Sequence, residues 1–164
     1  KKYQLNMGAL GFRKPARGVF WLPFALFGGA MAVLIAYSQF LSLLGLEPDT
    51  DLPDAAFDNL IPYAVLVVLT LGMAPLMEET FFRGFFFKGV ARRYGSVVGI
   101  IASGCLFGIV HAANPGGLYI VFPITTIGAI FAWGLYYSDS IYPGIIAHLA
   151  FNMLTVVSGF INAH

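Results

Sequence analysis

The stretch Leu60–Arg93, LIPYAVLVVLTLGMAPLMEETFFRGFFFKGVARR, joins a long apolar run to an abrupt cluster of charge. Its first part, Leu60–Met77, contains no charged side chain. A bilayer core about 30 Å thick requires about 20 apolar residues per helix, so this run predicts a membrane-spanning helix. The helical pattern continues through Glu78–Arg93, and we expect a kink after Pro75.

The whole chain has the composition of a membrane protein. Of its 164 residues, 59% are hydrophobic and 10% are charged, whereas a soluble domain carries roughly 25% charged residues. Lipid must therefore cover most of the surface. No run of Lys and Arg alternates with aromatic residues on a polar background, so the sequence gives no support for nucleic-acid binding. The single cysteine, Cys105, cannot form an internal disulfide, and we expect it to be a small buried hydrophobic residue.

Four further apolar stretches predict four more membrane helices. They are separated by an acidic loop at Glu47–Asp58, a turn at Asn114–Gly117 and a short break at Ser138–Ser140. The sequence therefore predicts an all-α fold, a polytopic transmembrane helix bundle with about five spans. The four additional helices are predicted over Gly18–Leu46, Ser96–His111, Leu118–Tyr137 and from Pro143 to about Phe160.

The charged residues predict how these helices are oriented. Basic residues gather before residue 18 and over Lys88–Arg93, whereas five of the eight acids lie in the loop Glu47–Asp58. The positive-inside rule places the basic N-terminus and the Lys88–Arg93 cluster in the cytoplasm and the acidic loop outside. The first apolar stretch is long and lacks a small-residue cleavage site, so we expect no cleavable signal peptide.

Glu78, Glu79 and Arg83 lie close together in an otherwise apolar helix. A charge near the middle of a membrane helix costs about 2.5–3.5 kcal/mol on insertion, so the three carry about 8–10 kcal/mol before pairing. Glu79 and Arg83 are four residues apart on one helix face, which predicts an ion pair. Glu78 points about 100° away and is left free to face a cavity. Alternatively, the glutamates mark the interfacial end of the span and the phenylalanines of 81–87 form an aromatic belt.

Two more helices carry titratable side chains in apolar surroundings. Gly104 and Gly108, just before His111, form a GxxxG pair that permits close helix approach. His148 precedes Asn152 by four residues, so both lie on one helix face. A single histidine on an apolar face is more often a satisfied core residue. Two histidines and an unpaired glutamate on three membrane helices instead indicate a functional site.

The depths of these side chains in the membrane agree only in part. At 1.5 Å per residue, Glu78 lies about 21 Å and His111 about 24 Å from the cytoplasmic end of its helix. His148 lies only about 10 Å from the start of its helix. It reaches the other two only if that helix starts inside the protein, as a connection Ser138–Tyr142 that dips into the bundle would allow.

Three motifs occur in order on these helices: EExxxR at Glu78–Arg83, FxxxH at Phe107–His111 and HxxxN at His148–Asn152. Together they resemble the CPBP family of intramembrane glutamic endopeptidases, which includes the type II CAAX prenyl proteases and the bacteriocin-processing and self-immunity proteins. The resemblance covers about residues 60–160. It implies a catalytic helix bundle over 60–164, preceded by an N-terminal segment, 1–59, with the first transmembrane helix and the acidic extracytoplasmic loop.

The resemblance also implies a role for each matching residue. Glu78 would be the general base that activates a water, helped by His111. His148 and Asn152 would donate hydrogen bonds to the oxyanion of the tetrahedral intermediate, and the Glu79–Arg83 pair would support the site. No cofactor or metal is implied. The expected partners are a peptide or membrane-protein substrate, the lipid bilayer of a bacterial plasma membrane and, in some settings, other membrane subunits.

Three other functions remain open at this point. Two histidines and a glutamate could hold a catalytic zinc ion, although no HExxH pair lies on one helix. The chain could be a non-catalytic subunit or scaffold of a larger membrane complex that retains the peptidase fold. Glutamate and histidine in membrane helices also serve proton-coupled carriers, but residues 94–138 offer little besides His111 for a proton path.

Overall fold

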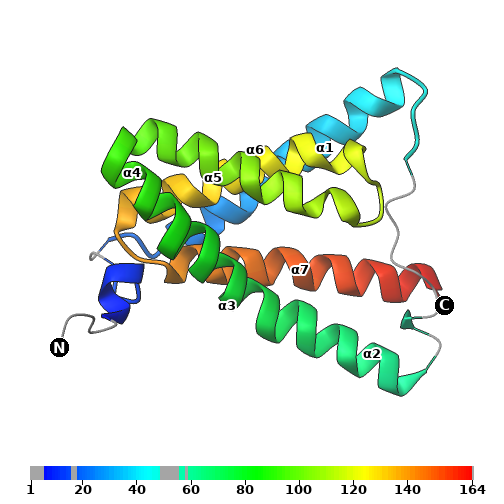
Figure 1. Ribbon diagram of the computed structural model, residues 1–164. Helices are drawn as coiled ribbons and strands as arrows, with labels where there is room; N and C mark the ends of the chain where they lie inside the picture. Colours follow the sequence, from blue (N-terminus) through cyan, green and yellow to red (C-terminus); the bar gives the residue numbers. More distant parts are fainter. Residues whose placement is uncertain (1–5, 16–17, 49–55, 58, 164) are drawn as a thin grey trace.

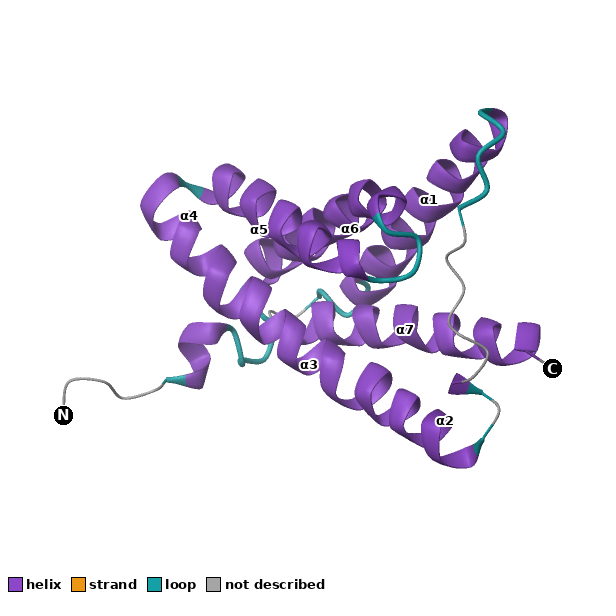
Figure 2. Ribbon diagram, turned by 45° about the vertical axis from the view of Figure 1, so that its right-hand side comes forward, coloured by secondary structure: helices purple, strands orange, loops and turns teal. Residues whose placement is uncertain are grey.

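The computed structural model describes residues 6–15, 18–48, 56–57 and 59–163. Within these ranges every regular element is a helix, as Figure 2 shows, so the predicted all-α fold is confirmed. In chain order the elements are the 3-10 helix η1 (Met7–Leu10), α1 (Leu22–Leu43), α2 (Leu60–Val67), the π-helix η3 (Val68–Met73), α3 (Ala74–Glu78), the π-helix η4 (Glu79–Phe87), α4 (Lys88–Tyr94), α5 (Ser96–Val110), the 3-10 helix η5 (His111–Ala113), α6 (Leu118–Ser138) and α7 (Tyr142–Ala163).

Five helical stretches in the described part of the chain are long and apolar enough to cross a membrane, which confirms the predicted number. Their ends differ from the predicted ends by a few residues. The first span begins at Leu22, with Pro23 in its first turn, where a missing N–H leaves no hydrogen bond unmade. The last begins at Tyr142. His111 lies just beyond α5 and begins a 3-10 turn.

Elements α2 to α4 form one continuous helix, Leu60–Tyr94, that crosses the bundle (Figure 1). At 1.5 Å per residue its length of about 50 Å exceeds the bilayer core, so it must tilt or project beyond it. Pro75 lacks an N–H and its ring crowds the carbonyl four residues earlier. The wide π turn of η3 directly precedes it and absorbs this misfit. A second π-helical segment, η4, follows Pro75 four residues later, so the helix departs from α geometry on both sides of the proline. The kink expected after Pro75 stays a prediction.

Helices α5 and α6 lie side by side at unusually short range. A Cβ added to Gly104 would lie 2.6 Å from the carbonyl oxygen of Thr125, and one added to Gly108 would lie 2.7 Å from that of Val121. On the opposite helix, a Cβ added to Gly128 would lie 3.0 Å from Cα of Gly104. The predicted GxxxG contact is thus confirmed, and it fixes the helix that ends at His111 against the centre of the bundle.

The first span belongs to the same hydrophobic core as the later helices. Leu22, Leu26 and Ala30 of α1 are buried against Phe131 of α6 and Ala147 of α7. The core therefore extends across residue 59, the boundary suggested by the sequence. The division into an N-terminal segment, 1–59, and a catalytic bundle, 60–164, stays a prediction.

The outside of the bundle is covered by apolar side chains, which identifies the chain as an integral membrane protein. Phe24, Leu43, Leu60 and Leu118 are all more than three-quarters exposed, an arrangement that suits lipid and not water. Cys105 is also exposed, so the expectation that it is buried was wrong. It lies on the lipid side of α5, where a small thiol is as compatible with acyl chains as with a protein core.

Candidate active site

The predicted ion pair between Glu79 and Arg83 is present and almost completely buried. Nη1 of Arg83 lies 2.9 Å from Oε1 of Glu79, and the two side chains are 0% and 1% exposed. Both belong to η4, the π-helix that follows Glu78. π-Helical segments occur frequently at functional sites, and here the segment carries the buried ion pair of the chain's most apolar span.

Aromatic rings and one backbone carbonyl surround the arginine. Its guanidinium lies 4.2 Å from the ring centre of Phe107 and 5.5 Å from that of Phe131. Nη2 donates to the carbonyl of Gly128 at 3.3 Å. A cation over ring faces is stabilised by their negative potential, and more strongly where water is excluded. Arg83 is therefore a buried, oriented cation that ties η4 to α5 and α6.

His148 of α7 contacts both glutamates. Its Nδ1 lies 3.0 Å from Oε1 of Glu79, the oxygen that also binds Arg83. Its Nε2 lies 3.8 Å from Oε2 of Glu78. Because a carboxylate oxygen accepts hydrogen bonds and does not donate them, Nδ1 carries the proton and Glu79 fixes the ring orientation. Sequence reasoning missed this contact, because nothing in the local pattern joins residues 69 positions apart.

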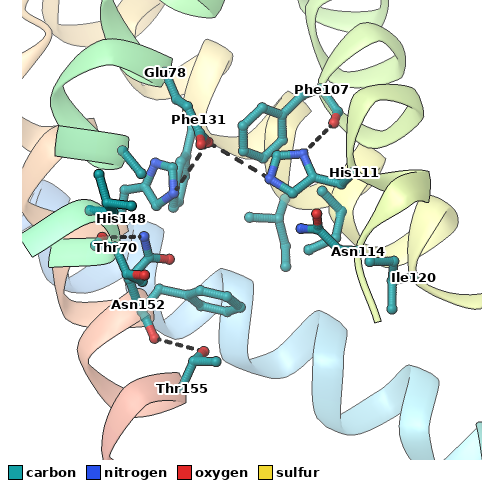
Figure 3. A pocket seen from close by; sticks show the side chains of 15 residues that line it. Thr70, Glu78, Phe107, His111, Asn114, Ile120, Phe131, His148, Asn152 and Thr155 are labelled. Atoms are coloured by element: carbon teal, nitrogen blue, oxygen red, sulfur yellow. Dashed lines mark hydrogen bonds and ion pairs between the residues drawn. The ribbon is translucent and has the colours of Figure 1, made fainter. Parts of the chain in front are cut away.

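His111 approaches Glu78 from the other side. Its Nδ1 donates to the carbonyl of Phe107 at 2.7 Å, since that carbonyl can only accept. Nε2 is thereby directed toward Oε2 of Glu78, 3.7 Å away. Figure 3 shows the carboxylate of Glu78 between the two imidazole rings. The structure thus brings together Glu78, His111 and His148 from three separate helical segments.

Asn152 lines the same cavity but does not contact Glu78 directly. Its Nδ2 donates to the carbonyl of Thr70 at 2.9 Å. Thr70 lies in η3, where the π turn changes the ordinary helical hydrogen-bonding pattern. Asn152 therefore links α7 to the long helix, a structural contact that the motif alone did not reveal.

These side chains line a cavity of about 320 Å³. Glu78, His111, His148 and Asn152 all face it (Figure 3). Oε2 of Glu78 is buried and has no hydrogen-bond donor among the described residues. A buried polar atom normally has a protein or water partner, and this cavity has room for water beside it. The remaining wall is mostly apolar: Leu69, Ala74, Phe107, Ile120, Ile124, Ile127, Phe131 and Phe151.

The burial of the connection between α6 and α7 explains how His148 reaches Glu78. Ser140 and Ile141 are 0% and 1% exposed, and the side chain of Ile141 packs against Gly84, inside the bundle. Gly84 is six residues from Glu78, and Ile141 is seven residues from His148. The two distances match at 1.5 Å per residue. The helix of His148 therefore starts well inside the bundle, which removes the discrepancy in depth seen in the sequence.

Comparison with known proteins supplies the family. Residues 60–154, more than half of the chain, match the model of the type II CAAX prenyl endopeptidase Rce1-like family. The chain belongs to this family of membrane proteases. An uncharacterized protein of Mycoplasma capricolum subsp. capricolum is 34% identical over 97 residues, which cover 58% of this chain and 28% of that protein. The chain thus matches less than a third of its relative's length. No solved structure matches it.

The same geometry bears on the zinc alternative. Among the described residues, no group of three or more His, Cys, Asp and Glu side chains is arranged to hold a metal ion. Nδ1 of His148 donates to Glu79 and Nδ1 of His111 donates to the Phe107 carbonyl, so Nε2 is the ring nitrogen that each of the two histidines directs toward Glu78. What the arrangement offers directly is a carboxylate and two imidazole nitrogens that converge on one small volume.

Proposed function

We propose that this protein is an intramembrane endopeptidase in which Glu78 and His111 activate a water molecule for attack on a peptide bond. The observation that carries the proposal is the position of Glu78 Oε2, 3.7 Å and 3.8 Å from the Nε2 atoms of His111 and His148 at the cavity wall. These distances are too long for direct hydrogen bonds. They suit a water or substrate oxygen held between the three groups.

The proposed reaction has two proton transfers through Glu78. The water gives one proton to the carboxylate of Glu78 as its oxygen bonds to the carbonyl carbon, and Nε2 of His111 accepts a hydrogen bond from the same water. The tetrahedral intermediate then collapses. The carbon–nitrogen bond breaks, Glu78 returns the proton to the leaving nitrogen, and the products are a carboxylic acid and an amine.

His148 and Asn152 are proposed to stabilise the oxyanion. One N–H of the Asn152 amide is given to Thr70, and the second is available. Nδ1 of His148 donates to Glu79, so Nε2 can donate only when the ring carries both protons, and the Glu79 carboxylate then balances its charge. A donor at the oxyanion is typically worth about 10²–10³ in kcat.

The proposed setting is a bacterial plasma membrane with the N-terminus in the cytoplasm. Part of the charge pattern behind this orientation, including Lys1, Lys2, Arg17 and the acids at 49–54 and 58, lies outside the described residues. The cavity is lined by Asn114, from the connection after α5, and by Thr155, far along α7. The C-terminal ends of α5 and α7 both lie on the side of the bundle opposite α4 (Figure 1). The substrate, a peptide or a membrane protein, would thus enter from the extracytoplasmic side or the bilayer.

The test is a cleavage assay with purified protein in detergent or vesicles. The probes are a peptide that ends in a prenylated CAAX sequence, the same peptide without the prenyl group, and a bacteriocin leader peptide. Glu78→Gln keeps the size of the side chain but removes the base, so we expect cleavage to fall about 10²–10⁴-fold. Glu47→Gln is the matched control, because Glu47 is an exposed glutamate outside this cavity. It should cleave like the wild type.

Other outcomes separate the alternatives. Equal cleavage by wild type and Glu78→Gln would overturn the assignment of the base. Loss of wild-type cleavage on zinc removal, with recovery on zinc addition, would favour a zinc-dependent mechanism. Co-purification in a stable membrane complex whose activity is unaffected by Glu78→Gln would favour an accessory subunit.

A further inference from the structure

The segment before the first span, residues 7–13, is fastened to the α6–α7 connection; we call it the N-terminal strap. The backbone N–H of Ile141 donates to the carbonyl of Gly11 at 2.9 Å, and the hydroxyl of Ser140 donates to the carbonyl of Arg13 at 2.7 Å. Nη1 of Arg13 also pairs with Oδ2 of Asp139 at 2.6 Å. Figure 1 shows η1 beside this connection, at the end of the bundle away from the chain's C-terminus.

The other side of the strap lies against the long helix. A Cβ added to Gly84 would lie 2.7 Å from the carbonyl oxygen of Leu10, closer than real side-chain contacts allow. Glycine at this position therefore lets the strap's backbone touch η4 directly. Lys88, one turn further along the helix, places Nζ 3.4 Å from Oδ1 of Asp139. The strap and the connection are thus held together on the helix that carries Glu78 and Glu79.

The connection itself has a defined shape. Asp139 has a φ of 50°, in the left-handed region that aspartate and asparagine tolerate better than most residues. Oγ of Ser138 lies 2.7 Å from the carbonyl oxygen of Gly134 in α6 and 3.0 Å from that of Ser140, and it accepts from the N–H of Ser140 at 3.3 Å. Because this connection is hydrogen-bonded to the strap, the position of the strap sets where α7 begins.

Helix α7 starts at this connection, and His148 lies within its first two helical turns. A Cβ added to Gly144 would lie 2.8 Å from Oε2 of Glu79, so the first turn of α7 already touches the glutamate. His148 follows Gly144 by one helical turn and binds the other oxygen of the same carboxylate. The position of His148 relative to both glutamates is therefore set by where α7 begins.

We propose that the N-terminal strap is a positioning element for His148. It acts through Ser140 and Ile141, and none of its residues lines the catalytic cavity. Gly84, Asp139 and Ser140 are the positioning residues: the first admits the strap's backbone and the other two fasten the turn. The effect on peptide cleavage rests on the proposed function, whereas the effect on the His148 ring does not.

The test is Gly84→Ala, with Gly89→Ala as the matched control. Both glycines lie on the same long helix, but a Cβ at Gly89 meets nothing within 4 Å. In Gly84→Ala the strap is displaced, so trypsin should cleave after Arg13 faster than in the wild type, as measured by mass spectrometry. The ¹⁵N resonance of His148 Nδ1 should shift, because its contact with Glu79 changes. Gly89→Ala should match the wild type in both measurements.

The kinetic readout separates positioning from substrate binding. In Gly84→Ala we expect kcat to fall about 10- to 100-fold, because a displacement near 1 Å is enough for such a loss. KM should change little, because the cavity wall that binds substrate is intact. Ser140→Ala, which adds no volume, should cause a smaller change in the same direction and serves if Gly84→Ala does not fold. Its control is Ser158→Ala, an exposed serine of α7.

Two results would overturn the proposal. One is faster cleavage after Arg13 with an unchanged His148 resonance, which would mean that the strap moves without affecting the site. The other is an unchanged resonance and an unchanged kcat in both Gly84→Ala and Ser140→Ala. If the wild type cleaves no peptide, the proposed function fails, while the His148 resonance still decides whether the strap positions the ring.

Discussion

Oε1 of Glu79 has two partners, Nη1 of Arg83 at 2.9 Å and Nδ1 of His148 at 3.0 Å. One buried oxygen thus joins a cation on its own helix to a histidine on another. A buried carboxylate without such partners would be costly. Glu79 is therefore both a partner of Arg83 and the group that orients His148, whereas the sequence suggested only the first of these two contacts.

At the residue scale, the stability of the site should depend on Arg83. Arg83→Met removes the cation but leaves the Glu79 carboxylate buried, so we expect the free energy of unfolding to fall by about 3–5 kcal/mol. Arg92→Met is the control, because Arg92 is exposed and its loss should change stability by less than about 0.5 kcal/mol. Unfolding in mixed micelles measures both variants.

The prediction is tested by the difference between Arg83→Met and Arg92→Met in the free energy of unfolding. If Arg83→Met and Arg92→Met lost the same small amount of stability, the buried pair would not contribute as described. The double variant Glu79→Gln with Arg83→Met should be less destabilised than Arg83→Met alone, because it no longer buries an unpaired carboxylate.

At the scale of elements, each of the two π-helical segments of the long helix accepts a hydrogen bond from a polar side chain of α7. In η3 the carbonyl of Thr70 accepts from Asn152, and in η4 Glu79 accepts from His148. Asn152 and His148 are four residues apart and share one face of α7. The two polar residues of the HxxxN motif therefore contact both π-helical segments of the neighbouring helix, which gives the motif a structural role in addition to its proposed catalytic role.

The close contact between α5 and α6 should be sensitive to a single methyl group. Gly104→Ala would place a Cβ 2.6 Å from a backbone carbonyl that cannot rotate away, so the helices must separate. We expect a loss of roughly 1–3 kcal/mol in the free energy of unfolding, as for other overpacked cores. Gly28→Ala on α1 is the control, because a Cβ there meets nothing within 4 Å. Thermal unfolding followed by circular dichroism compares them.

Separation of α5 from α6 would also move His111, which follows directly after α5. The Gly104→Ala variant should therefore lose cleavage activity together with stability. Equal melting temperatures for Gly104→Ala and Gly28→Ala would contradict the close packing of the two helices.

At the scale of the whole molecule, the basic residues of α4 and the Asn114 side of the cavity lie toward opposite ends of the bundle. Arg92 and Arg93 lie at the end of α4, whereas Asn114, at the other end of α5, lines the cavity. In the proposed orientation, a soluble probe therefore reaches Asn114 from the extracytoplasmic side and Arg92 from the cytoplasm.

Cysteine labelling tests this orientation in intact cells. On a Cys105→Ser background, Asn114→Cys should react with a membrane-impermeant maleimide added outside, because the proposed orientation places the exposed Asn114 on that side. Arg92→Cys should react only after the membrane is permeabilised. The reverse pattern would show that the end of the bundle with Asn114 faces the cytoplasm and would overturn the proposed orientation.

Much of the fold could be predicted from the sequence, because the helices are decided locally. The spacing of apolar residues, the turn residues at 114–117 and the cost of unpaired polar backbone in lipid leave few alternatives to five helices. The Glu79–Arg83 pair and the Gly104–Gly108 contact also follow from spacing on a helix. Cys105 shows the limit of this reasoning, because an apolar residue in a membrane helix can face either protein or lipid.

The arrangement of the site was decided only by the tertiary structure. His148 meets Glu79 across 69 residues and Asn152 meets Thr70 across 82, and no periodicity along one helix encodes such contacts. In our proposal, the start of α7 inside the bundle depends on the N-terminal strap, which contacts both Gly84 and Ile141, residues far from it in the sequence. The sequence by itself determined which polar residues enter the membrane. Packing of the helices determined that Glu78, His111 and His148 converge, because only packing sets where each helix begins relative to the others.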